Sequence, residues 1–458
     1  MRSCPRIFLS AGEASGDAYG AALIAALRKR LPQAAFTGLG GKQMEQAGQE
    51  RIVKAEDVAV MGLTEILCHI PSIFARYRKL VSSIRKQRPD VAVLIDFPDV
   101  NFRLARRLRR AGVLVVWFVS PQLWAWKRDR LRLVQQWVDK MLVIFPFEES
   151  FYRSRGVDAE FVGHPLAEMQ AAAQQNPSPA LSPQAGRNAY AAQYHLDPAK
   201  TWIALLPGSR WKEIHANLPT MHELAMSDLI SGAAAHTTFN GDTTLQPPNP
   251  AAYTHYEFLL PVASTIQISA LQKYIAELNV EHLKYFGPEA STLRLTLVPD
   301  AAEALLHARA SVVASGTATV LAALIGNPFV VVYRVSALTF ALLKRWVQYP
   351  EELHARRDRN GNLPISMVNL IAQRRVVPEL LQNHFTAANV ATALGPLLNE
   401  GPERERQIQG LSEVRRRLTL SGKSESRPSQ PPIERVSDVV VQLLQTDPED
   451  LSGSESSS

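Results

Sequence analysis

Short, continuous apolar runs alternate with helical patterns along most of this chain. Val91–Ile95 and Val113–Val119 are apolar throughout, which is typical of parallel strands buried on both faces. Ala18–Arg30 places its apolar residues at helical spacing instead. Such alternation favours α/β architecture with doubly wound parallel sheets. The expected strands are Arg6–Leu9, Phe36–Leu39, Val91–Ile95, Val113–Val119, Met141–Ile144 and Phe161–Val162 in a first half, then a run beginning at Trp202, Tyr256–Val262, Leu283–Phe286, Leu295–Val298, Ala310–Ala314 and Phe329–Tyr333 in a second.

The length of 458 residues exceeds one ordinary core and predicts two domains. We expect one Rossmann-like domain over residues 1–168 and a second over 201–395. Residues 169–200 are rich in Ala, Gln, Pro and Ser, which is typical of a linker. A C-terminal helical segment is expected over 396–445, and a disordered tail over the Ser-rich residues 446–458.

Composition and missing motifs exclude several classes of protein. Only Cys4 and Cys68 are present, too few for a disulfide framework or a cysteine metal site. No apolar run reaches about 18 residues, and the N-terminus lacks a secretory signal pattern. The sequence contains no Walker P-loop, no Gly-x-Ser-x-Gly elbow and no histidines at metal-ligand spacing. These features predict a cytoplasmic protein with no metal and no other cofactor.

Basic residues are concentrated in two stretches, within a net charge of +7. Six basic residues and no acid lie between Arg76 and Arg88, and nine lie between Arg103 and Arg132, with Asp129 as the only acid. Such stretches bind anionic membrane surfaces or nucleic acid, or are simply solvated helix faces. Because no nucleic-acid motif accompanies them, we favour a membrane surface and expect no nucleic acid as a partner.

Polar and aromatic side chains follow two expected strands of the first half. Asp96 comes directly after Val91–Ile95, and a carboxylate at the carboxyl end of a parallel strand lies where open α/β sheets bind ligands. Its alternative role is to cap the next helix, a role that Asp99 or Asn101 could also take. Ser120-Pro-Gln-Leu-Trp-Ala-Trp126 follows the next strand. A glutamine and two tryptophans there indicate a wall for a sugar-sized ligand.

Two motifs in the second half indicate phosphate binding. Leu205-Leu-Pro-Gly-Ser-Arg210 places a glycine, a hydroxyl and a guanidinium at a strand end, although a turn with a surface arginine is common there. Ser315-Gly-Thr-Ala-Thr319 opens a helix, where exposed N–H groups and hydroxyls bind anions or simply cap the helix. Together the two motifs favour a diphosphate site.

Several short motifs occur in a fixed order between about residues 6 and 382. They are Ser10–Asp17, Met61–Ile66, Asp96–Phe102, Ser120–Trp126, Phe145–Glu148, Gly163–Pro165, Leu206–Arg210, Ser315–Thr319 and Asn369–Ala372. In this order they resemble the motifs of the lipid-A-disaccharide synthase family. The resemblance implies a GT-B glycosyltransferase fold, in which two Rossmann-like domains face a cleft.

The resemblance also implies a reaction. UDP-2,3-diacylglucosamine would give its sugar to the 6-hydroxyl of 2,3-diacylglucosamine 1-phosphate (lipid X), with inversion, forming a β-1,6 disaccharide and UDP. The first domain would bind the acceptor and the second the UDP-sugar. The family further implies peripheral association with the cytoplasmic surface of the inner membrane, and a homodimer with exchanged C-terminal helices.

Site residues are implied where this sequence matches the family motifs. Asp96 matches the proposed catalytic base, with Asp99 as a helix cap or orienting partner. The donor residues are Ser209, Arg210, Ser315, Gly316, Thr317, Ala318, Thr319 and Asn369. The acceptor-side residues are Glu13, Ser15, Gln122 and Trp124. Met61–Phe74 is apolar enough to line an acyl-chain groove or enter the membrane interface, or it is a core helix.

The chain departs from the family pattern at several places. Leu321 stands where the pattern has a glutamate near the donor ribose, and Gln373 stands where it has a glycine. Residues 236–252 read as a surface insertion or a lid, and residues 349–364 are longer and more charged than expected. Two rival functions stay open. One is a non-catalytic relative that binds lipid or UDP-sugar, and the other is a UDP-sugar enzyme of the same fold, such as an epimerase.

Overall fold

The computed structural model describes residues 4–59, 66–175, 183–226, 255–286, 295–358, 361–419 and 430–445. They belong to two compact units, each described here by itself. The first unit comprises Met1–Met169, Val347–Glu352 and Leu418–Ser458, and the second comprises Gln170–Trp346 and Leu353–Arg417. The chain therefore leaves the first unit and re-enters it twice. We call the short middle segment, Val347–Glu352, the strap.

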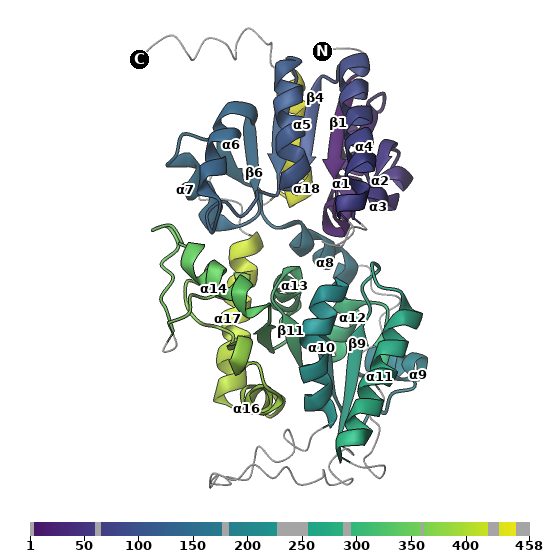
Figure 1. Ribbon diagram of the computed structural model, residues 1–458, viewed down its shortest axis with the longest axis vertical. Helices are drawn as coiled ribbons and strands as arrows, with labels where there is room; N and C mark the ends of the chain where they lie inside the picture. Colours follow the sequence, from purple (N-terminus) through teal and green to yellow (C-terminus); the bar gives the residue numbers. More distant parts are fainter. Residues whose placement is uncertain are drawn as a thin grey trace. The chain divides into compact units, whose positions relative to one another are not determined.

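Seven described strands of the first unit form one parallel sheet, in the order β3-β2-β1-β4-β5-β6-β7 (Figure 1). They are β1 (Arg6–Ala11), β2 (Ala35–Gly40), β3 (Glu50–Lys54), β4 (Val91–Ile95), β5 (Leu114–Phe118), β6 (Lys140–Val143) and β7 (Ala159–Phe161). All five residues of β4 are buried, as expected for a central strand covered on both faces. The helices are α1 (Ala14–Arg30), α2 (Lys42–Gln46), α3 (Glu56–Ala59), α4 (Ile66–Gln87), α5 (Pro98–Arg110), α6 (Leu131–Trp137), α7 (Pro146–Arg153) and α18 (Pro432–Gln445), with a 3-10 turn η1 at Arg128–Arg130.

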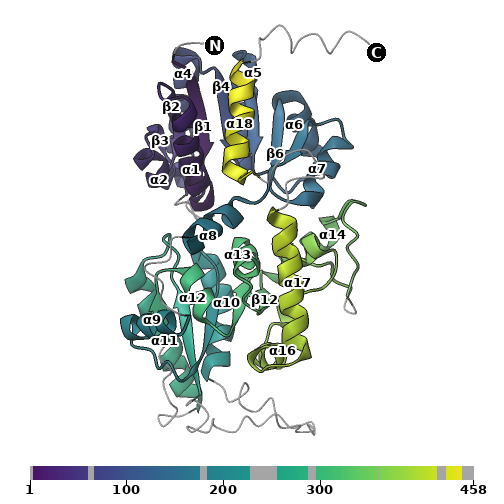
Figure 2. The same cartoon turned by 180° about the vertical axis from the view of Figure 1, so that it is seen from behind.

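Helix α18, from the far end of the sequence, completes the first unit. It packs on α1 and also contacts β4 and β5, and Figure 2 shows it lying against this sheet. Val436 and Val440 of α18 are fully buried. At its start, Arg435 donates to Glu160 at 2.8 Å and the Ile433 N–H donates to Glu168 at 2.9 Å. The C-terminal helix therefore covers one face of the N-terminal sheet of its own chain.

Six described strands of the second unit form another parallel sheet, in the order β10-β9-β8-β11-β12-β13. They are β8 (Thr201–Leu206), β9 (Tyr256–Pro261), β10 (Thr296–Val298), β11 (Ala310–Ala314), β12 (Phe329–Tyr333) and β13 (Glu379–Leu381). The helices are α9 (Pro183–Tyr194), α10 (Trp211–Met226), α11 (Ile268–Phe286), α12 (Ala301–His307), α13 (Thr317–Ile325), α14 (Ala337–Trp346), α15 (Met367–Ala372), α16 (Ala387–Leu398) and α17 (Pro402–Thr419), with a 3-10 turn η4 at Gln382–His384. Helix α8 (Pro165–Gln175) contains the first passage between the units.

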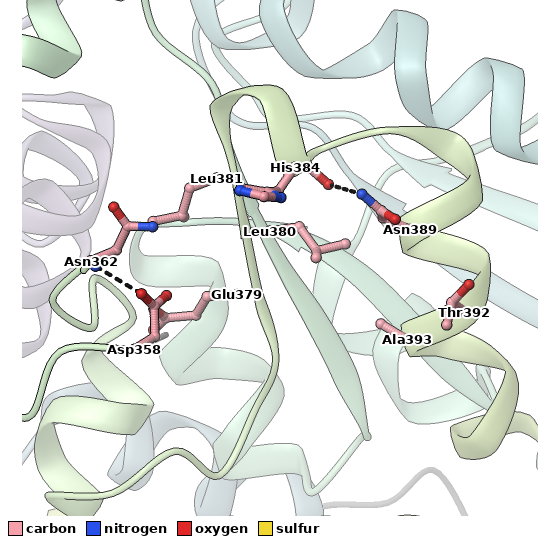
Figure 3. A pocket seen from close by; sticks show the side chains of 9 residues that line it. All are labelled: Asp358, Asn362, Glu379, Leu380, Leu381, His384, Asn389, Thr392 and Ala393. Atoms are coloured by element: carbon pink, nitrogen blue, oxygen red, sulfur yellow. Dashed lines mark hydrogen bonds between the residues drawn. The ribbon is translucent and has the colours of Figure 1, made fainter. Parts of the chain in front are cut away.

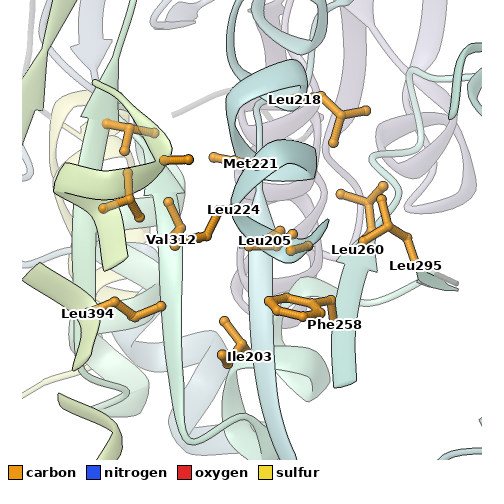
Figure 4. Packing of buried hydrophobic residues seen from close by; sticks show 14 of the residues in the cluster. Ile203, Leu205, Leu218, Met221, Leu224, Phe258, Leu260, Leu295, Val312 and Leu394 are labelled. Carbon is orange, nitrogen blue, oxygen red and sulfur yellow. The ribbon is translucent and has the colours of Figure 1, made fainter. Parts of the chain in front are cut away.

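The core of the second unit lies between the central strands and helices α10 and α16. Leu205, Leu218, Phe258, Val312 and Leu394 belong to this cluster, and Figure 4 shows them converging from separate elements. Burying a Leu or Phe side chain fully stabilises a fold by about 1.5–3 kcal/mol. The cluster therefore fixes β8 beside β11, on whose ends the predicted phosphate motifs lie.

Some sequence predictions need correction, and others lie outside the described residues. Leu283–Phe286, predicted as a strand, is the last turn of helix α11, because a four-residue segment with three apolar residues does not distinguish the two structures. The predicted linker 169–200 contains part of α8 and all of α9, and the predicted helical segment 396–445 is divided between the two units. The insertion 236–252 and the tail 446–458 lie outside the described residues.

Candidate active site

In both sheets the strand order reverses beside the first strand of the unit. β1 lies between β2 and β4, and β8 lies between β9 and β11. Open α/β sheets bind ligands at such a switch point, beyond the carboxyl ends of the two strands. In the first unit these ends lead to Glu13 and Asp96, and in the second to Arg210 and Ser315. Most of the predicted site residues therefore follow strands at the two switch points.

The backbone around Asp96 is strained. Asp96 and Phe97 both have left-handed conformations, with φ values of 45° and 50°. Residues other than glycine rarely adopt this region, and the strain persists only where the surroundings enforce it. Here the Phe97 ring fills the space beside Gly12, where an added Cβ would lie 2.4 Å from a ring carbon. Backbone strain of this kind is concentrated at functional sites, which supports a role for Asp96.

The buried side chain of Asn101 is hydrogen-bonded to the strained turn. This side chain is fully buried, and its Nδ2 donates to the carbonyls of Asp96 at 2.6 Å and Ile95 at 3.3 Å. Its Oδ1 accepts from the Ser10 hydroxyl at 2.6 Å. Asn101 therefore links the carboxyl ends of β1 and β4, and it fixes the backbone that carries the Asp96 carboxylate.

Asp99 has a different environment from Asp96. It lies in the first turn of α5, whose N-cap residue is Phe97, so Asp99 is not the cap that the sequence allowed. Its carboxylate is 74% exposed and pairs with Arg130 at 3.0 Å. Asp96 instead lies near the buried Tyr19. The pKa of the Tyr19 phenol is raised, first by burial of the ring and then by the negative charge of Asp96. Of these two acids, Asp96 follows a strand and lies near a buried side chain, whereas Asp99 is exposed on the first turn of α5.

The loop after β1 presents Glu13 and Ser15 at the start of helix α1. Glu13 is the N-cap residue without a side-chain capping bond, and both side chains are partly exposed. Asp17, one turn further on, has a structural role instead. Its buried carboxylate accepts from the backbone N–H groups of Gly41 at 2.9 Å and Met44 at 3.0 Å, at the start of α2. Glu13 and Ser15 thus remain accessible near the first switch point.

The Ser120–Trp126 loop, which follows β5, exposes only part of its predicted wall. Gln122 is exposed and Trp126 is 40% exposed, but Trp124 is only 2% exposed. The Trp124 Nε1 donates to the Glu148 carboxylate at 3.0 Å. The Trp124 ring is therefore used in packing within this unit. Trp126 and Gln122 present the accessible surface of this loop.

Glu148 is the buried acid beneath that loop. Its Oε1 accepts from the Ser120 hydroxyl at 2.7 Å as well as from Trp124, and its Oε2 accepts from the Phe145 N–H at 3.2 Å. Burial raises the pKa of the Glu148 carboxyl to about 7, although these hydrogen bonds favour its charged form. One carboxylate therefore caps helix α7 and bonds two residues of the Ser120–Trp126 loop.

In the second unit, the turn after β8 carries Ser209 and Arg210. Both side chains are exposed. The backbone N–H groups of Ser209 and Arg210 donate to the Glu213 carboxylate at 2.9 and 3.3 Å, and the Arg210 guanidinium lies 3.5 Å from it. Gly208, with φ 129°, allows this approach, because a Cβ there would lie 2.4 Å from the Glu213 oxygen. Amide and guanidinium donors thus converge on one anionic group at this strand end.

The predicted residues 315–319 follow the adjacent strand β11. Gly316 and Thr317 are exposed, Ser315 and Ala318 are partly exposed, and helix α13 begins at Thr317. Thr319 is fully buried, and its hydroxyl donates to the Gly316 carbonyl at 2.7 Å. Gly316 and Thr317 are therefore accessible to a ligand, whereas Thr319 stabilises the turn. Leu321, on the same helix, is partly exposed.

Asn369 lies on helix α15, which contacts α13. It is 1% exposed, and it bonds residues that lead into β13. Its Nδ2 donates to the Val377 carbonyl and to the Glu379 carboxylate, and its Oδ1 accepts from the N–H groups of Val376 and Val377. All four hydrogen-bonding positions of the amide are used within the protein. The structure therefore gives Asn369 a structural environment, and Glu379, whose pKa is raised by burial, is its partner.

A cavity of about 330 Å³ lies beside β13 in the second unit (Figure 3). It is lined by Asp358, Asn362, Glu379, Leu380, Leu381, His384, Asn389, Thr392 and Ala393. The predicted donor residues are not among them. Glu379 connects the cavity wall to Asn369 through the hydrogen bond at 2.8 Å.

Gln373 adopts the left-handed conformation that the family pattern fills with glycine. It ends helix α15 with a φ of 55°. A residue with a Cβ loses about 1–2 kcal/mol of stability in left-handed backbone. Replacing it with glycine recovers only part of this, because glycine has more conformational entropy in the unfolded chain. We expect Gln373→Gly to raise the free energy of unfolding by about 0.5–1 kcal/mol in urea titrations. Gln373→Ala, which keeps the Cβ, is the control, and an equal gain there would contradict the explanation.

Asn101, Glu148 and Glu213 act on the predicted site residues but were not predicted to do so. Each lies inside a family motif or close to one, and each acts through a buried contact or a backbone contact. A sequence signal did exist for Glu213, because acidic residues are enriched in the first turn of a helix. No comparable signal marks Asn101, since its contact with Ser10 spans 91 residues.

Comparison with known proteins agrees with this arrangement. A family model described as lipid-A-disaccharide synthetase matches residues 7–237 and 263–429. The lipid-A-disaccharide synthase of Acidobacterium capsulatum is 48% identical over 97% of this chain and 98% of its own length. That of Koribacter versatilis is 44% identical over 92% of this chain and 95% of its own. The chain belongs to the lipid-A-disaccharide synthase family. As a member it is a hexosyltransferase that acts in lipid A disaccharide synthesis.

Solved structures agree on the fold. A glycosyltransferase of kitacinnamycin has a TM-score of 0.55 at 12% identity, covering 96% of this chain and 99% of that one. A putative UDP-N-acetylglucosamine 2-epimerase from Listeria monocytogenes has a TM-score of 0.53 at 11% identity, covering 97% and 98%. The two parallel-sheet units are therefore those of the predicted GT-B fold. Across the described ranges, no helix has both the length and the apolar character to span a bilayer.

Proposed function

We propose that this synthase transfers the sugar of UDP-2,3-diacylglucosamine to the 6-hydroxyl of lipid X, releasing UDP and forming the β-1,6 disaccharide. The observation that carries the proposal is Asp96. This carboxylate follows a central strand at the switch point of the first unit, on a strained turn that Asn101 and Gly12 enforce. Family membership supplies the reaction class.

In the proposed mechanism Asp96 is the general base. It accepts the proton of the acceptor 6-hydroxyl as that oxygen attacks C1 of the donor sugar. The bond between C1 and the diphosphate oxygen breaks, and its electron pair leaves with UDP. Attack from the opposite face inverts the configuration at C1.

The second unit would bind the leaving diphosphate. Arg210, the N–H groups at Ser209, and the start of α13 at Gly316 and Thr317 supply donors for its developing charge. On donor binding the phosphate oxygens would take the donors that Glu213 now holds. Thr319 and Asn369, which are buried and fully bonded, would shape this site from behind. On the acceptor side we propose that Glu13, Ser15 and Gln122 contact lipid X.

Purified protein tests the proposal in one assay. With UDP-2,3-diacylglucosamine and lipid X together, UDP release and a disaccharide of the summed mass are expected. Omission of lipid X should abolish both products. An epimerase would change the donor sugar without lipid X, and a non-catalytic binder would release no UDP. Either result would sink the proposal.

Both substrates carry acyl chains, and we propose that the protein works at the cytoplasmic surface of the inner membrane. On α4, Phe74 is 58% exposed, the exposed Arg78 lies one turn further along the same face, and the exposed Lys79 follows it. An apolar side chain beside cations is typical of an interfacial helix. Of the apolar stretch before it, residues 61–65 lie outside the described residues, and for residues 66–73 only the helical backbone is described. We also propose a homodimer, which sedimentation equilibrium would detect as a doubled mass.

We expect the triple substitution of Arg76, Arg78 and Lys79 by Glu to abolish co-sedimentation with anionic liposomes. Each lost cation removes about 1 kcal/mol of attraction to an anionic surface, and the new acids add repulsion. A variant with Glu at Lys273, Lys284 and Arg406 has the same net charge and serves as the control. Unchanged binding of the α4 variant, or equal loss in the control, would contradict membrane contact through α4.

A further inference from the structure

The Ser120–Trp126 loop is held from below by helix α7. Glu148 bonds Ser120 and Trp124, and the Tyr152 hydroxyl donates to the Pro121 carbonyl at 3.1 Å. Just before the loop, Val119 has a φ of 64°, an outlier for a β-branched residue. The surroundings must enforce this conformation, and they thereby fix the direction in which the loop leaves β5.

The strap packs on the same loop from another direction. The Tyr349 ring lies 5.7 Å from the Trp124 ring, and the Gln348 N–H donates to the Ala125 carbonyl at 3.3 Å. The Gln348 carbonyl accepts from Arg128, just after the loop. Trp124 is therefore enclosed between Glu148 and Tyr349, and the backbone of the loop is bonded as well.

The far end of the strap is fixed to helix α7 and its C-terminal end. Glu352 accepts from the Arg155 guanidinium at 2.7 Å and from the Ser154 hydroxyl at 3.1 Å. The Glu352 side chain is only 22% exposed, and the guanidinium–carboxylate contact gives this end a defined position. Both the loop and the strap are thus tied to α7.

In the sequence, the strap lies between two segments of the second unit, although it belongs to the first unit. The chain before it, up to Trp346, and the chain after it, from Leu353, belong to the second unit. Only six residues leave that unit, contact the Ser120–Trp126 loop, and return. They include the start of the 349–364 stretch that departs from the family pattern.

We propose that the strap is a positioning element for the Ser120–Trp126 loop, and that Tyr349 and Glu352 set the affinity for the acceptor lipid. The inference rests on the proposed function, in which Gln122 of this loop contacts lipid X. Tyr349 and Glu352 act through Trp124 and α7. Loss of Tyr349 or Glu352 would shift the positions of Gln122 and Trp126 on the loop. It would not alter the proposed phosphate-binding turn after β8.

The test compares Tyr349→Ala and Glu352→Gln with two matched controls. Tyr349→Phe keeps the ring on Trp124, and Glu351→Gln changes the exposed acid next to Glu352. We expect Tyr349→Ala to raise the KM and Kd for lipid X about tenfold, as loss of the ring contact with Trp124 allows, and Glu352→Gln several-fold. The KM for the UDP-sugar and the Kd for UDP should stay within twofold. Tyr349→Phe should restore wild-type values.

Equal rises for donor and acceptor, or no rise for the acceptor, would overturn the inference. Hydrogen exchange gives a second reading, since peptides covering 120–126 should lose protection in Tyr349→Ala but not in Tyr349→Phe. If wild-type protein binds lipid X without releasing UDP, the proposed function fails and the Kd series alone decides the role of the strap. If wild-type protein binds no lipid X, both ideas fail.

Discussion

Replacing Asp96 with alanine is expected to lower kcat for disaccharide formation by about 10²- to 10⁴-fold, the usual contribution of a general base. The acceptor hydroxyl would then attack without a group to take its proton. Because Asn101 bonds the backbone of residue 96 and not its carboxylate, the turn itself should survive the substitution. The melting temperature and the Kd for UDP should therefore change little, and UDP release at saturating donor and acceptor measures the effect.

Asp99→Ala is the matched control for this experiment. Asp99 is also a carboxylate on the same turn, but it is exposed and paired with Arg130. Surface ion pairs of this kind contribute about 0–1 kcal/mol, so activity should stay within about twofold. If the Asp99 variant lost as much activity as the Asp96 variant, the assignment of the base would be wrong. Asp96→Asn, which keeps the shape of the side chain, should be as inactive as the alanine variant.

Arg210→Ala is expected to lower kcat by about 10²- to 10³-fold, the usual effect of removing one donor to a developing negative charge. The guanidinium lies beside the two backbone N–H groups that Glu213 now occupies, and it is 65% exposed, so a ligand can reach it from the solvent side. Single-turnover measurements would separate this loss from weaker donor binding.

Two companion variants sharpen the Arg210 experiment. Arg210→Lys keeps the charge but not the two-pronged geometry, and it should recover only part of the activity. Lys212→Ala removes an exposed cation two residues away and should leave kcat within about twofold. If Lys212→Ala matched Arg210→Ala, general charge and not a placed donor would explain the loss.

The positions of the strand-end residues could be predicted from the sequence. A five-residue apolar run followed by an acid places Asp96 at a strand end, and the same reasoning places Arg210 and Ser315. These are local patterns, which depend only on residues that are neighbours in the sequence. They sufficed for the fold class and for the strand-end positions of most of the predicted site residues.

Contacts between distant residues decided the rest. Trp124 has the same local pattern as Trp126, yet it is buried because Glu148, 24 residues later, accepts its N–H. The position of the strap depends on contacts such as that of Arg128 with Gln348, which are 220 residues apart. Asn369 begins one of the motifs on which the family resemblance rests, but its burial follows from its pairing with Glu379. No local pattern encodes such pairings.

The return of α18 to the first unit bears on how the protein is made. On the ribosome, the strands of the first unit emerge before any of the second, but α18 follows about 260 residues later, a delay of about 13–50 s at the usual rate of synthesis. Until then the face of α1 that α18 covers stays open to water. The half of the enzyme that is translated first is therefore completed last, and nascent chains stalled before Pro432 would be substrates for chaperones.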